Sequence, residues 1–195
     1  MSADPLFING RRISRDVPPY IIAELSANHN GKLETALKII EEAAKAGADA
    51  VKLQTYRPDT ITLDSGADEF RIKGGLWDGR TLYELYEEAH TPWEWHKPLF
   101  EHARKTGIPI FSSPFDTTAV DLLEDLNAPA YKIASFEAVD LPLIRYVAAT
   151  GKPMIISTGM ADAEEIQEAI TAAREGGCKQ LAILHCVSGY PAPAE

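Results

Sequence analysis

Lys105-Thr106-Gly107-Ile108-Pro109-Ile110-Phe111-Ser112-Ser113 is the clearest copy of a recurring pattern: the end of a helix, a glycine, a short spacer, an apolar strand and polar side chains. Further copies span residues 45–55, 149–158 and 175–187. Strands that alternate with helices in this way form βαβ units and a parallel sheet. The sequence therefore predicts the α/β class, either a doubly wound sheet or a (β/α)8 barrel.

The residues after the first expected strand favour the barrel. Ser26-Ala27-Asn28-His29-Asn30-Gly31 stands where a dinucleotide-binding sheet has its glycine-rich turn. The pattern accounts for about six strands, and the chain stops at Glu195 in the loop after the sixth. Because a (β/α)8 TIM barrel closes with eight strands, we expect only its first six strands here, as part of a longer gene product.

Three segments are expected along the chain. Residues 1–19 contain Asn9-Gly10 between short apolar runs, a β-hairpin signal, and form an N-terminal cap. Residues 20–195 form the partial barrel domain. Within it, residues 57–85 are too polar for a strand and too long for a plain connection, which is typical of an ordered binding loop.

Composition argues against several classes of function. The net charge is -10 and the lysines and arginines are scattered, so nucleic acid is not an expected partner. No apolar run approaches the ~18 residues that span a bilayer. Cys178 and Cys186 lie outside the usual zinc spacings, and the start of the given sequence lacks the apolar core of a signal peptide. A cytoplasmic location is expected.

Polar side chains follow the expected strands, and strand ends converge on one site in a barrel. Lysines inside apolar strands need anionic partners. Two such ammonium groups, several hydroxyls and helix N-termini suit a small molecule with phosphate and carboxylate groups. Two carboxylates remain for proton transfer or for orienting water. The set is Glu24, Lys52, Gln54, Ser112, Ser113, Lys132, Ser135, Glu137, Ser157, Thr158, His185 and Ser188.

These residues also have structural interpretations. Serines at strand ends are most often caps or turn formers. Lys132 and Glu137 could form a structural ion pair, and Glu24 could pair with Lys52. Both interpretations stay open for the sequence alone.

Histidines offer two further hypotheses. His29 and His185 could hold a metal with Glu24, although a single histidine at a strand end is more often structural. A nucleophilic Cys186 activated by His185 is disfavoured, because adjacent strand residues point to opposite faces.

Several segments carry a family resemblance. Residues 22–31, 48–55, 131–137 and 184–191 resemble, in order, the signatures of the sialic acid synthase family, and the N-terminal hairpin resembles that family's barrel-bottom cap. The resemblance extends from about Pro19 to Glu195. Residues 72–83 and 89–95 resemble the pseudaminic acid synthase branch. Ser135-Phe136-Glu137 and Ser188 depart from the pattern typical of N-acetylneuraminate synthases.

The resemblance implies a transferase of nonulosonic acid biosynthesis. It would condense phosphoenolpyruvate with the aldehyde of a 2,4-diacetamido-2,4,6-trideoxyhexose to form pseudaminic acid, with C–O cleavage releasing phosphate. Apart from the resemblance, the placement and aromatic content of residues 57–85 lead us to expect that this segment faces the sugar and sets its specificity. By position, Glu24 and Glu137 would be catalytic, and the contacts to phosphoenolpyruvate would be Lys52, Gln54, Ser112, Lys132, Ser135, Ser157, Ser188 and Tyr190.

The resemblance also implies parts that these 195 residues lack. A divalent metal, Mn2+ or Mg2+, would be held by ligands beyond Glu195, and the full-length protein would be a homodimer whose partner subunit supplies an arginine. We therefore expect the chain alone to be inactive as a synthase.

Three alternatives remain at this point. The first is another synthase of the same family, acting on the precursor of N-acetylneuraminate or legionaminate. The second is a Schiff-base aldolase with Lys132 or Lys52 as nucleophile. The third is a non-catalytic ligand-binding fragment.

Overall fold

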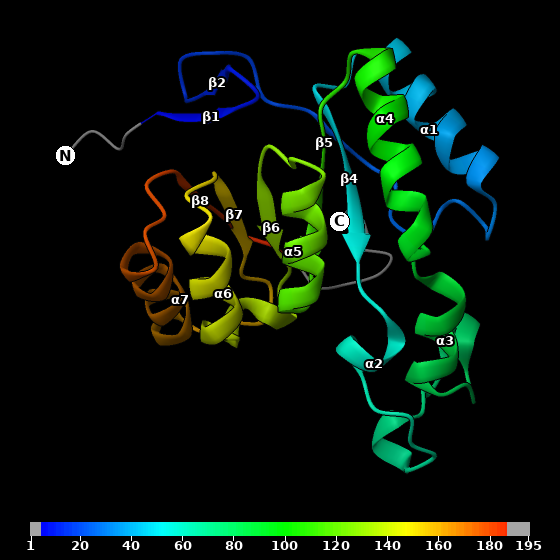
Figure 1. Cartoon of the computed structure of the whole chain (residues 1–195). Coiled ribbons are helices and arrows are strands. Elements are labelled where there is room, and N and C mark those ends of the chain that lie inside the picture. The colour runs from blue at the N-terminus through cyan, green and yellow to red at the C-terminus, as the bar shows by residue number, and fades with distance from the viewer. Residues whose placement is uncertain (1–4, 187–195) are drawn as a thin grey trace. The chain divides into compact units, whose positions relative to one another are not determined.

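A computed structural model of the chain describes residues 5–186. They divide into two compact units (Figure 1): unit 1 combines the segment up to Ile21 with the segment from Phe111, and unit 2 is Ile22–Ile110. Six strands are hydrogen-bonded in chain order in one sheet, and the registers show parallel pairs. This confirms the α/β class and the first six strands of a (β/α)8 barrel. The strands are β3 (Ile22–Glu24), β4 (Ala50–Thr55), β5 (Ile110–Pro114), β6 (Tyr131–Ile133), β7 (Met154–Ser157) and β8 (Leu181–Leu184).

The predicted N-terminal hairpin is present. Strands β1 (Leu6–Ile8) and β2 (Arg11–Ile13) pair antiparallel. Asn9 and Gly10 between them have φ of 48° and 81°, as a tight hairpin turn requires. The Phe7 N–H donates to Gln180 Oε1 at 2.6 Å, immediately before β8. The hairpin therefore lies at the N-terminal end of that strand, as expected for a barrel-bottom cap, while the domain limits 1–19 and 20–195 stay a prediction.

Two helices contribute to the core of unit 2. Helices α1 (Leu33–Lys45) and α4 (His96–Thr106) pack side by side (Figure 1). Ile40 of α1 and Leu99 of α4 are fully buried, and each such side chain contributes about 1.5–3 kcal/mol by leaving water. Gly107 has φ of 80° and caps α4 in the left-handed conformation.

Strand β3 is shorter than the predicted run of residues 20–26. It ends at Glu24, and Ser26 has φ of 44°, which no strand residue can adopt. The apolar run of residues 50–55 predicts the second strand, and β4 has this range. The Val51 N–H donates to Pro109 O at 2.9 Å, in the segment that leads into β5.

The segment 57–85, which the sequence predicted as an ordered binding loop, contains short helical elements that were not predicted. It contains helix α2 (Pro58–Ile61), two 3-10 turns, η1 (Asp68–Phe70) and η2 (Gly75–Trp77), and the start of helix α3 (Leu82–Ala89). A capping box starts α3: Thr81 Oγ1 accepts from the Glu84 N–H, and Glu84 Oε2 accepts from the Thr81 N–H. This local signal was missed in the sequence.

The sequence Thr91-Pro92-Trp93-Glu94 predicts a capping box that opens a helix, and this prediction is wrong. A 3-10 turn, η3 (Trp93–Trp95), opens there with Pro92 as its cap and no side-chain cap. A residue before proline is kept out of helical conformation, and the Trp95 N–H is satisfied by Pro92 O at 2.9 Å.

Three helices of unit 1 lie along one face of β6, β7 and β8 (Figure 1). The sequence predicts that each helix starts at an aspartate, and in each case the aspartate carboxylate accepts from N–H groups of the first turn. Such a cap stabilises a helix by about 1 kcal/mol. A 3-10 turn, η4 (Phe136–Val139), follows β6. The caps and helices are Asp116 with α5 (Thr117–Asp125), Asp140 with α6 (Leu141–Ala149) and Asp162 with α7 (Ala163–Glu175).

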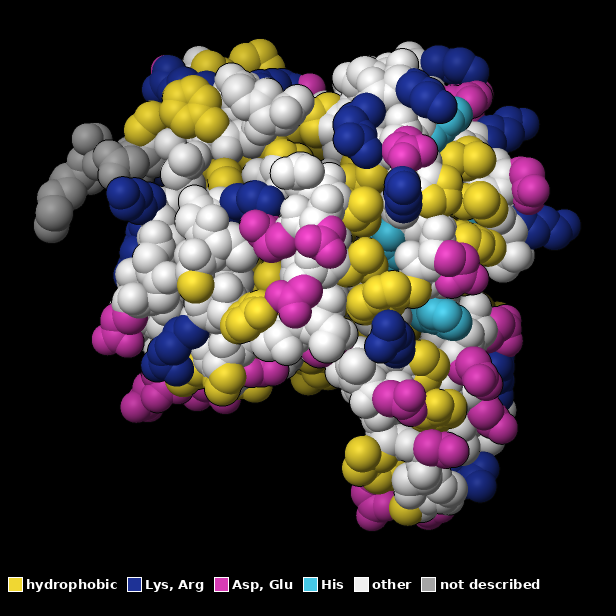
Figure 2. Space-filling view, viewed as in Figure 1, with side chains coloured by type: hydrophobic (Ala, Val, Ile, Leu, Met, Phe, Trp, Pro, Cys, Tyr) yellow, Lys and Arg dark blue, Asp and Glu magenta, His cyan; other side chains and the backbone are white. Residues whose placement is uncertain are grey.

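The surface carries mixed charge. On the face in Figure 2, basic and acidic side chains are interspersed, and acidic groups are frequent over the part that contains α2 and α3. No helix among residues 5–186 is both long enough and apolar enough to cross a membrane.

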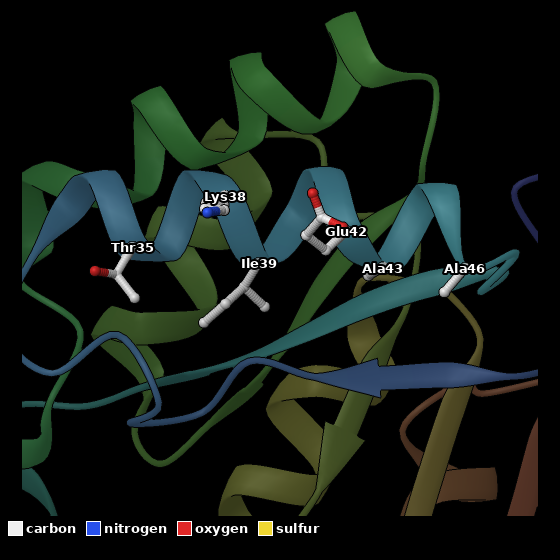
Figure 3. A pocket seen from close by; sticks show the side chains of 6 residues that line it. All are labelled: Thr35, Lys38, Ile39, Glu42, Ala43 and Ala46. Carbon is white, nitrogen blue, oxygen red and sulfur yellow. The ribbon is translucent and has the colours of Figure 1, made fainter.

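A shallow groove follows the flank of α1 (Figure 3). Small and apolar side chains dominate its lining, which suits the packing of a neighbouring element better than a charged ligand. The groove is formed by α1 rather than by the strand ends, so we assign it no substrate. Its lining residues are Thr35, Lys38, Ile39, Glu42, Ala43 and Ala46.

Candidate functional site

Lys52, in the middle of β4, and Glu24, at the C-terminal end of β3, form an ion pair between two neighbouring strands of unit 2. The register of β3 and β4 places the two residues opposite each other. Lys52 Nζ lies 2.7 Å from Glu24 Oε2 and 3.0 Å from Oε1. The Lys52 side chain is 7% exposed and that of Glu24 is 48% exposed. The pair that the sequence left open therefore forms, with a buried cation and a carboxylate that water or a ligand can reach.

Gln54 lies two residues further along β4, on the same face as Lys52. The Ser26 hydroxyl donates to Gln54 Oε1 at 2.9 Å. Within residues 5–186, no hydrogen bond is made by Gln54 Nε2. This strand face thus presents an ammonium group and a carboxamide donor, both suited to anionic oxygens.

His29 is a buried structural histidine. Its side chain is buried, and Nδ1 accepts from the Gly31 N–H at 3.1 Å, so the proton of the neutral ring is on Nε2. Its ring packs edge-on against Trp95 with centroids 5.3 Å apart. Burial lowers the pKa of His29, and the nearby His90 lowers it further. With its Nδ1 lone pair occupied, His29 does not fit the metal site considered above.

The metal hypothesis with Glu24, His29 and His185 finds no support in the described part of the chain. Among residues 5–186, no group of three or more histidine, cysteine or acidic side chains is placed to hold a metal ion. Likewise, no hydrogen bond joins Cys186 to His185 there; the Cys186 thiol is 3.5 Å from Leu184 O.

His96 connects the end of β4 to the start of α4. Its Nε2 lies 2.9 Å from the Thr55 hydroxyl, and its Nδ1 lies 3.2 Å from Pro92 O. Nδ1–H therefore donates to the carbonyl and Nε2 accepts from Thr55. The side chain is fully buried, and burial lowers the pKa of His96 to about 4. A neutral imidazole thus anchors the strand that carries Lys52 and Gln54.

Aromatic contacts order the residues that follow β4. The Arg57 guanidinium stacks on Trp93, 4.2 Å from the ring centroid. Tyr56 meets Tyr86 edge-on with centroids 5.6 Å apart. Burial raises the pKa of Tyr56. These contacts hold α2 and α3 beyond the C-terminal end of β4.

In unit 1, Glu137 is the carboxylate with an unusual environment. Burial raises the pKa of Glu137 to about 7; Lys132 opposes this rise, whereas Asp140 adds to it. Glu137 Oε2 is buried and has no hydrogen-bond partner among the described residues. Lys132 is half-buried in β6, with Nζ 3.5 Å from Ile133 O. A carboxyl group that titrates near neutrality can both donate and accept a proton.

Hydroxyl groups follow the strands of unit 1. Ser135 Oγ accepts from the Gly159 N–H at 3.2 Å, which joins the loops after β6 and β7. Ser112 in β5 and Ser157 in β7 are buried. The predicted contacts Ser188 and Tyr190 lie outside the described residues.

Comparison with known proteins identifies the family. The NeuB family matches residues 39–195. The chain belongs to the NeuB family. The resemblance to sialic acid synthases is thereby confirmed, and the residues described above are those of a NeuB-family chain.

The relatives of this NeuB-family chain differ in their sequence identity to it. The pseudaminic acid synthase of Helicobacter pylori is 53% identical over 91% of this chain and 52% of its own length. The N,N'-diacetyllegionaminic acid synthase of Campylobacter jejuni is 39% identical over 89% of this chain and 52% of its own length. This chain thus spans about half the length of the curated relatives it matches.

A solved structure is similar throughout. The N-acetylneuraminic acid synthetase of Leptospira borgpetersenii serovar Hardjo-bovis, in complex with citrate, has a TM-score of 0.84 and 29% identity, covering 98% of this chain and 62% of that chain. The NeuB-family fold therefore extends over the described strands and helices.

Two residues of this NeuB-family site were missed in the sequence. Ser26 has no local signal, because its contact with Gln54 depends on a left-handed backbone and on the β3–β4 register. His96 had a weak signal, a histidine in the first turn of a helix after proline, whose partner Thr55 is remote in the chain.

Proposed function

We propose that the complete protein condenses phosphoenolpyruvate with an open-chain 2,4-diacetamido-2,4,6-trideoxyhexose to form pseudaminic acid. The observation that carries the proposal is the identity of 53% with a pseudaminic acid synthase, against 39% with a legionaminic acid synthase. The buried ammonium of Lys52 and the donors around it add support, because they suit a substrate with phosphate and carboxylate groups.

In the proposed reaction, C3 of phosphoenolpyruvate bonds to the aldehyde carbon and water adds at C2. Phosphate leaves with the oxygen that joined it to C2, so the C–O bond breaks. The aldehyde oxygen gains a proton and the water loses one. The sum of phosphoenolpyruvate, sugar and water thus equals the acid and phosphate.

The residues of this chain divide these tasks. Lys52 and Lys132 neutralise phosphate and carboxylate, while Gln54 donates a hydrogen bond. Glu137, with a pKa of about 7, exchanges the proton. Glu24 orients Lys52 or the attacking water. The hydroxyls proposed to contact phosphoenolpyruvate are those of Ser112, Ser135, Ser157, Ser188 and Tyr190.

A divalent metal, Mn2+ or Mg2+, is part of the proposal. Residues 5–186 supply no cluster that fits it, so none of the steps above is assigned to it. Chelation with EDTA should abolish turnover, and added Mn2+ should restore it. A homodimer and a cytoplasmic location are proposals of the same origin, to be checked by sedimentation and cell fractionation.

We also propose that the segment 57–85 meets the sugar. It is ordered, rich in aromatic contacts and follows β4, the strand of Lys52. The Arg57 guanidinium on Trp93 offers donors for amide oxygens of the sugar. Replacing Arg57 by lysine should raise the KM for the sugar and leave that for phosphoenolpyruvate unchanged.

The deciding experiment is phosphate release by the complete gene product with Mn2+. The sugars, offered separately, are 2,4-diacetamido-2,4,6-trideoxy-altrose and N-acetylmannosamine. Release with the first alone supports the proposal. Release with the second alone keeps the family and refutes the pseudaminate product. With neither, borohydride trapping of a lysine adduct would support an aldolase, and turnover by the 195-residue chain alone would refute its expected inactivity.

A further inference from the structure

Ser26, in the loop after β3, has a backbone conformation that the roles above do not explain. Its φ is 44°. Residues other than glycine rarely adopt this left-handed conformation, because Cβ crowds the following carbonyl oxygen. Strain of this kind persists where the surrounding structure enforces it, and it is common at functional sites. Ser26 is two residues beyond Glu24, the partner of Lys52.

Hydrogen bonds on both sides enforce the conformation of this loop. The Asn28 N–H and Nδ2 both donate to Leu25 O at 3.0 Å. Further along, the Gly31 N–H donates to Nδ1 of the buried His29. Leu25 is itself fully buried. The backbone of the loop therefore determines where the Ser26 hydroxyl lies.

That hydroxyl determines the orientation of a side chain on β4. Ser26 Oγ donates to Gln54 Oε1 at 2.9 Å, which holds the carbonyl end of the carboxamide against the loop. The amino end is left for another acceptor, and within residues 5–186 it has none. A reversed carboxamide would present a carbonyl oxygen to an anion and repel it.

We propose that Ser26 is a positioning residue. It orients Gln54 so that the Nε2 amino group, on the strand face of Lys52, donates to an anionic oxygen of the bound ligand. This rests on the proposed function, in which the ligand is phosphoenolpyruvate, whose phosphate and carboxylate oxygens are acceptors. Ser26 acts through Gln54 and does not contact the ligand.

The test uses the complete protein with Ser26→Gly, Gln54→Ala and the double variant. Glycine relieves the left-handed strain and removes the hydroxyl. We expect Ser26→Gly to raise the KM for phosphoenolpyruvate about fivefold, the effect of one hydrogen bond, with kcat and melting temperature not lowered. In the Gln54→Ala background the same change should leave KM unaltered, because the residue it acts through is gone.

A matched control lies in the same loop. Asn30 also has a left-handed φ, 50°, and an exposed side chain, so Asn30→Gly relieves the same strain without touching Gln54. Its KM should stay at the wild-type value. A wild-type KM in Ser26→Gly, or an equal rise in both backgrounds, overturns the positioning role.

Calorimetric titration of wild-type protein with phosphoenolpyruvate distinguishes a failure of the proposed function from a failure of the proposed role of Ser26. If the wild type neither binds nor turns over phosphoenolpyruvate, the proposed function fails and the role of Ser26 fails with it. If the wild type binds and Ser26→Gly binds equally well, the role of Ser26 alone fails.

Discussion

Lys52 Nζ lies 2.7 Å from Glu24 Oε2, and the two residues face each other in the register of β3 and β4. The lysine side chain is 7% exposed and the glutamate side chain 48%. Burying a charge is expensive unless a partner is close. The carboxylate therefore stabilises a cation that the fold holds out of water, and that cation is one of the two proposed to bind phosphoenolpyruvate.

This difference in exposure predicts that removing the Glu24 side chain and removing the Lys52 side chain lower the stability of the protein by different amounts. Glu24→Ala leaves a buried cation without this carboxylate and should lower the unfolding free energy of the complete protein by about 1–3 kcal/mol. Lys52→Met leaves an exposed carboxylate and should lower it less, while removing phosphoenolpyruvate binding. Denaturant unfolding and calorimetric titration measure the two effects. Equal destabilisation by both variants would contradict the prediction.

Glu137 predicts a specific pH dependence of stability. Its pKa of about 7 in the folded chain exceeds the ordinary value of 4.5, so the folded state holds the proton more tightly than the unfolded state. This contribution is complete below pH 4.5 and is lost as pH rises through 7. Glu137→Gln removes the titration, so its melting temperature relative to wild type should rise between pH 5 and pH 8.

The control for this measurement is Glu168→Gln on the exposed surface of α7. This variant measures how exchanging a surface carboxylate for an amide changes the melting temperature at each pH. If the difference for Glu137→Gln, after that of the control is subtracted, does not change with pH, Glu137 does not titrate as described.

His96 predicts a pH dependence of stability in the opposite direction. Its pKa is lowered from 6.5 to about 4. The stability that the neutral ring contributes is therefore fully present above pH 6.5 and is lost as pH falls toward 4. Nitrogen NMR of the complete protein should show a neutral His96 ring at pH 5.5, protonated at Nδ1. A ring that becomes charged near pH 6.5 would refute this.

The partner of His96 gives an independent test. Thr55→Val removes the hydroxyl that donates to Nε2 at 2.9 Å and leaves a buried acceptor unpaired. We expect a loss of about 1–3 kcal/mol in unfolding free energy. A loss within experimental error would mean that this hydrogen bond contributes nothing.

Gly176 is required where α7 ends against α6. A Cβ there would lie 2.7 Å from Ala148 Cβ and 3.0 Å from Arg145 O. Its φ of -69° suits any residue, so space alone excludes a side chain. Gly176→Ala should destabilise the protein by about 1–3 kcal/mol through overpacking. Gly66→Ala is the control: its Cβ would meet only Arg71 Nη2 at 3.6 Å, and its melting temperature should match that of wild type.

Sequence predictions succeeded where the signal depends on a few neighbouring residues and failed where it depends on distant ones. Asp116, Asp140 and Asp162 were predicted as caps and act as caps, because a cap depends on the few residues after it. Helix α3 and the 3-10 turn before α4 were not predicted. Residues 57–85 lack the repeat that marked the other elements, and proline at residue 92 mimics the start of a helix.

The sequence predicted which types of residue form the candidate site, but it predicted only some of the contacts between them. Lys52 was expected to need an anion, and the structure shows that Glu24 supplies one. The raised pKa of Glu137 depends on burial by surrounding elements, which no spacing in the sequence encodes.

The order of strands, the hairpin turn and most helix ends follow from local sequence, because hydrophobic period, glycine and capping residues act over a few positions. The contacts of Lys52 with Glu24 and of Ser26 with Gln54 each join residues 28 apart in the chain. They depend on strand register and on a left-handed backbone that the rest of the loop enforces. Long-range packing sets both, so these contacts became visible only in the folded chain.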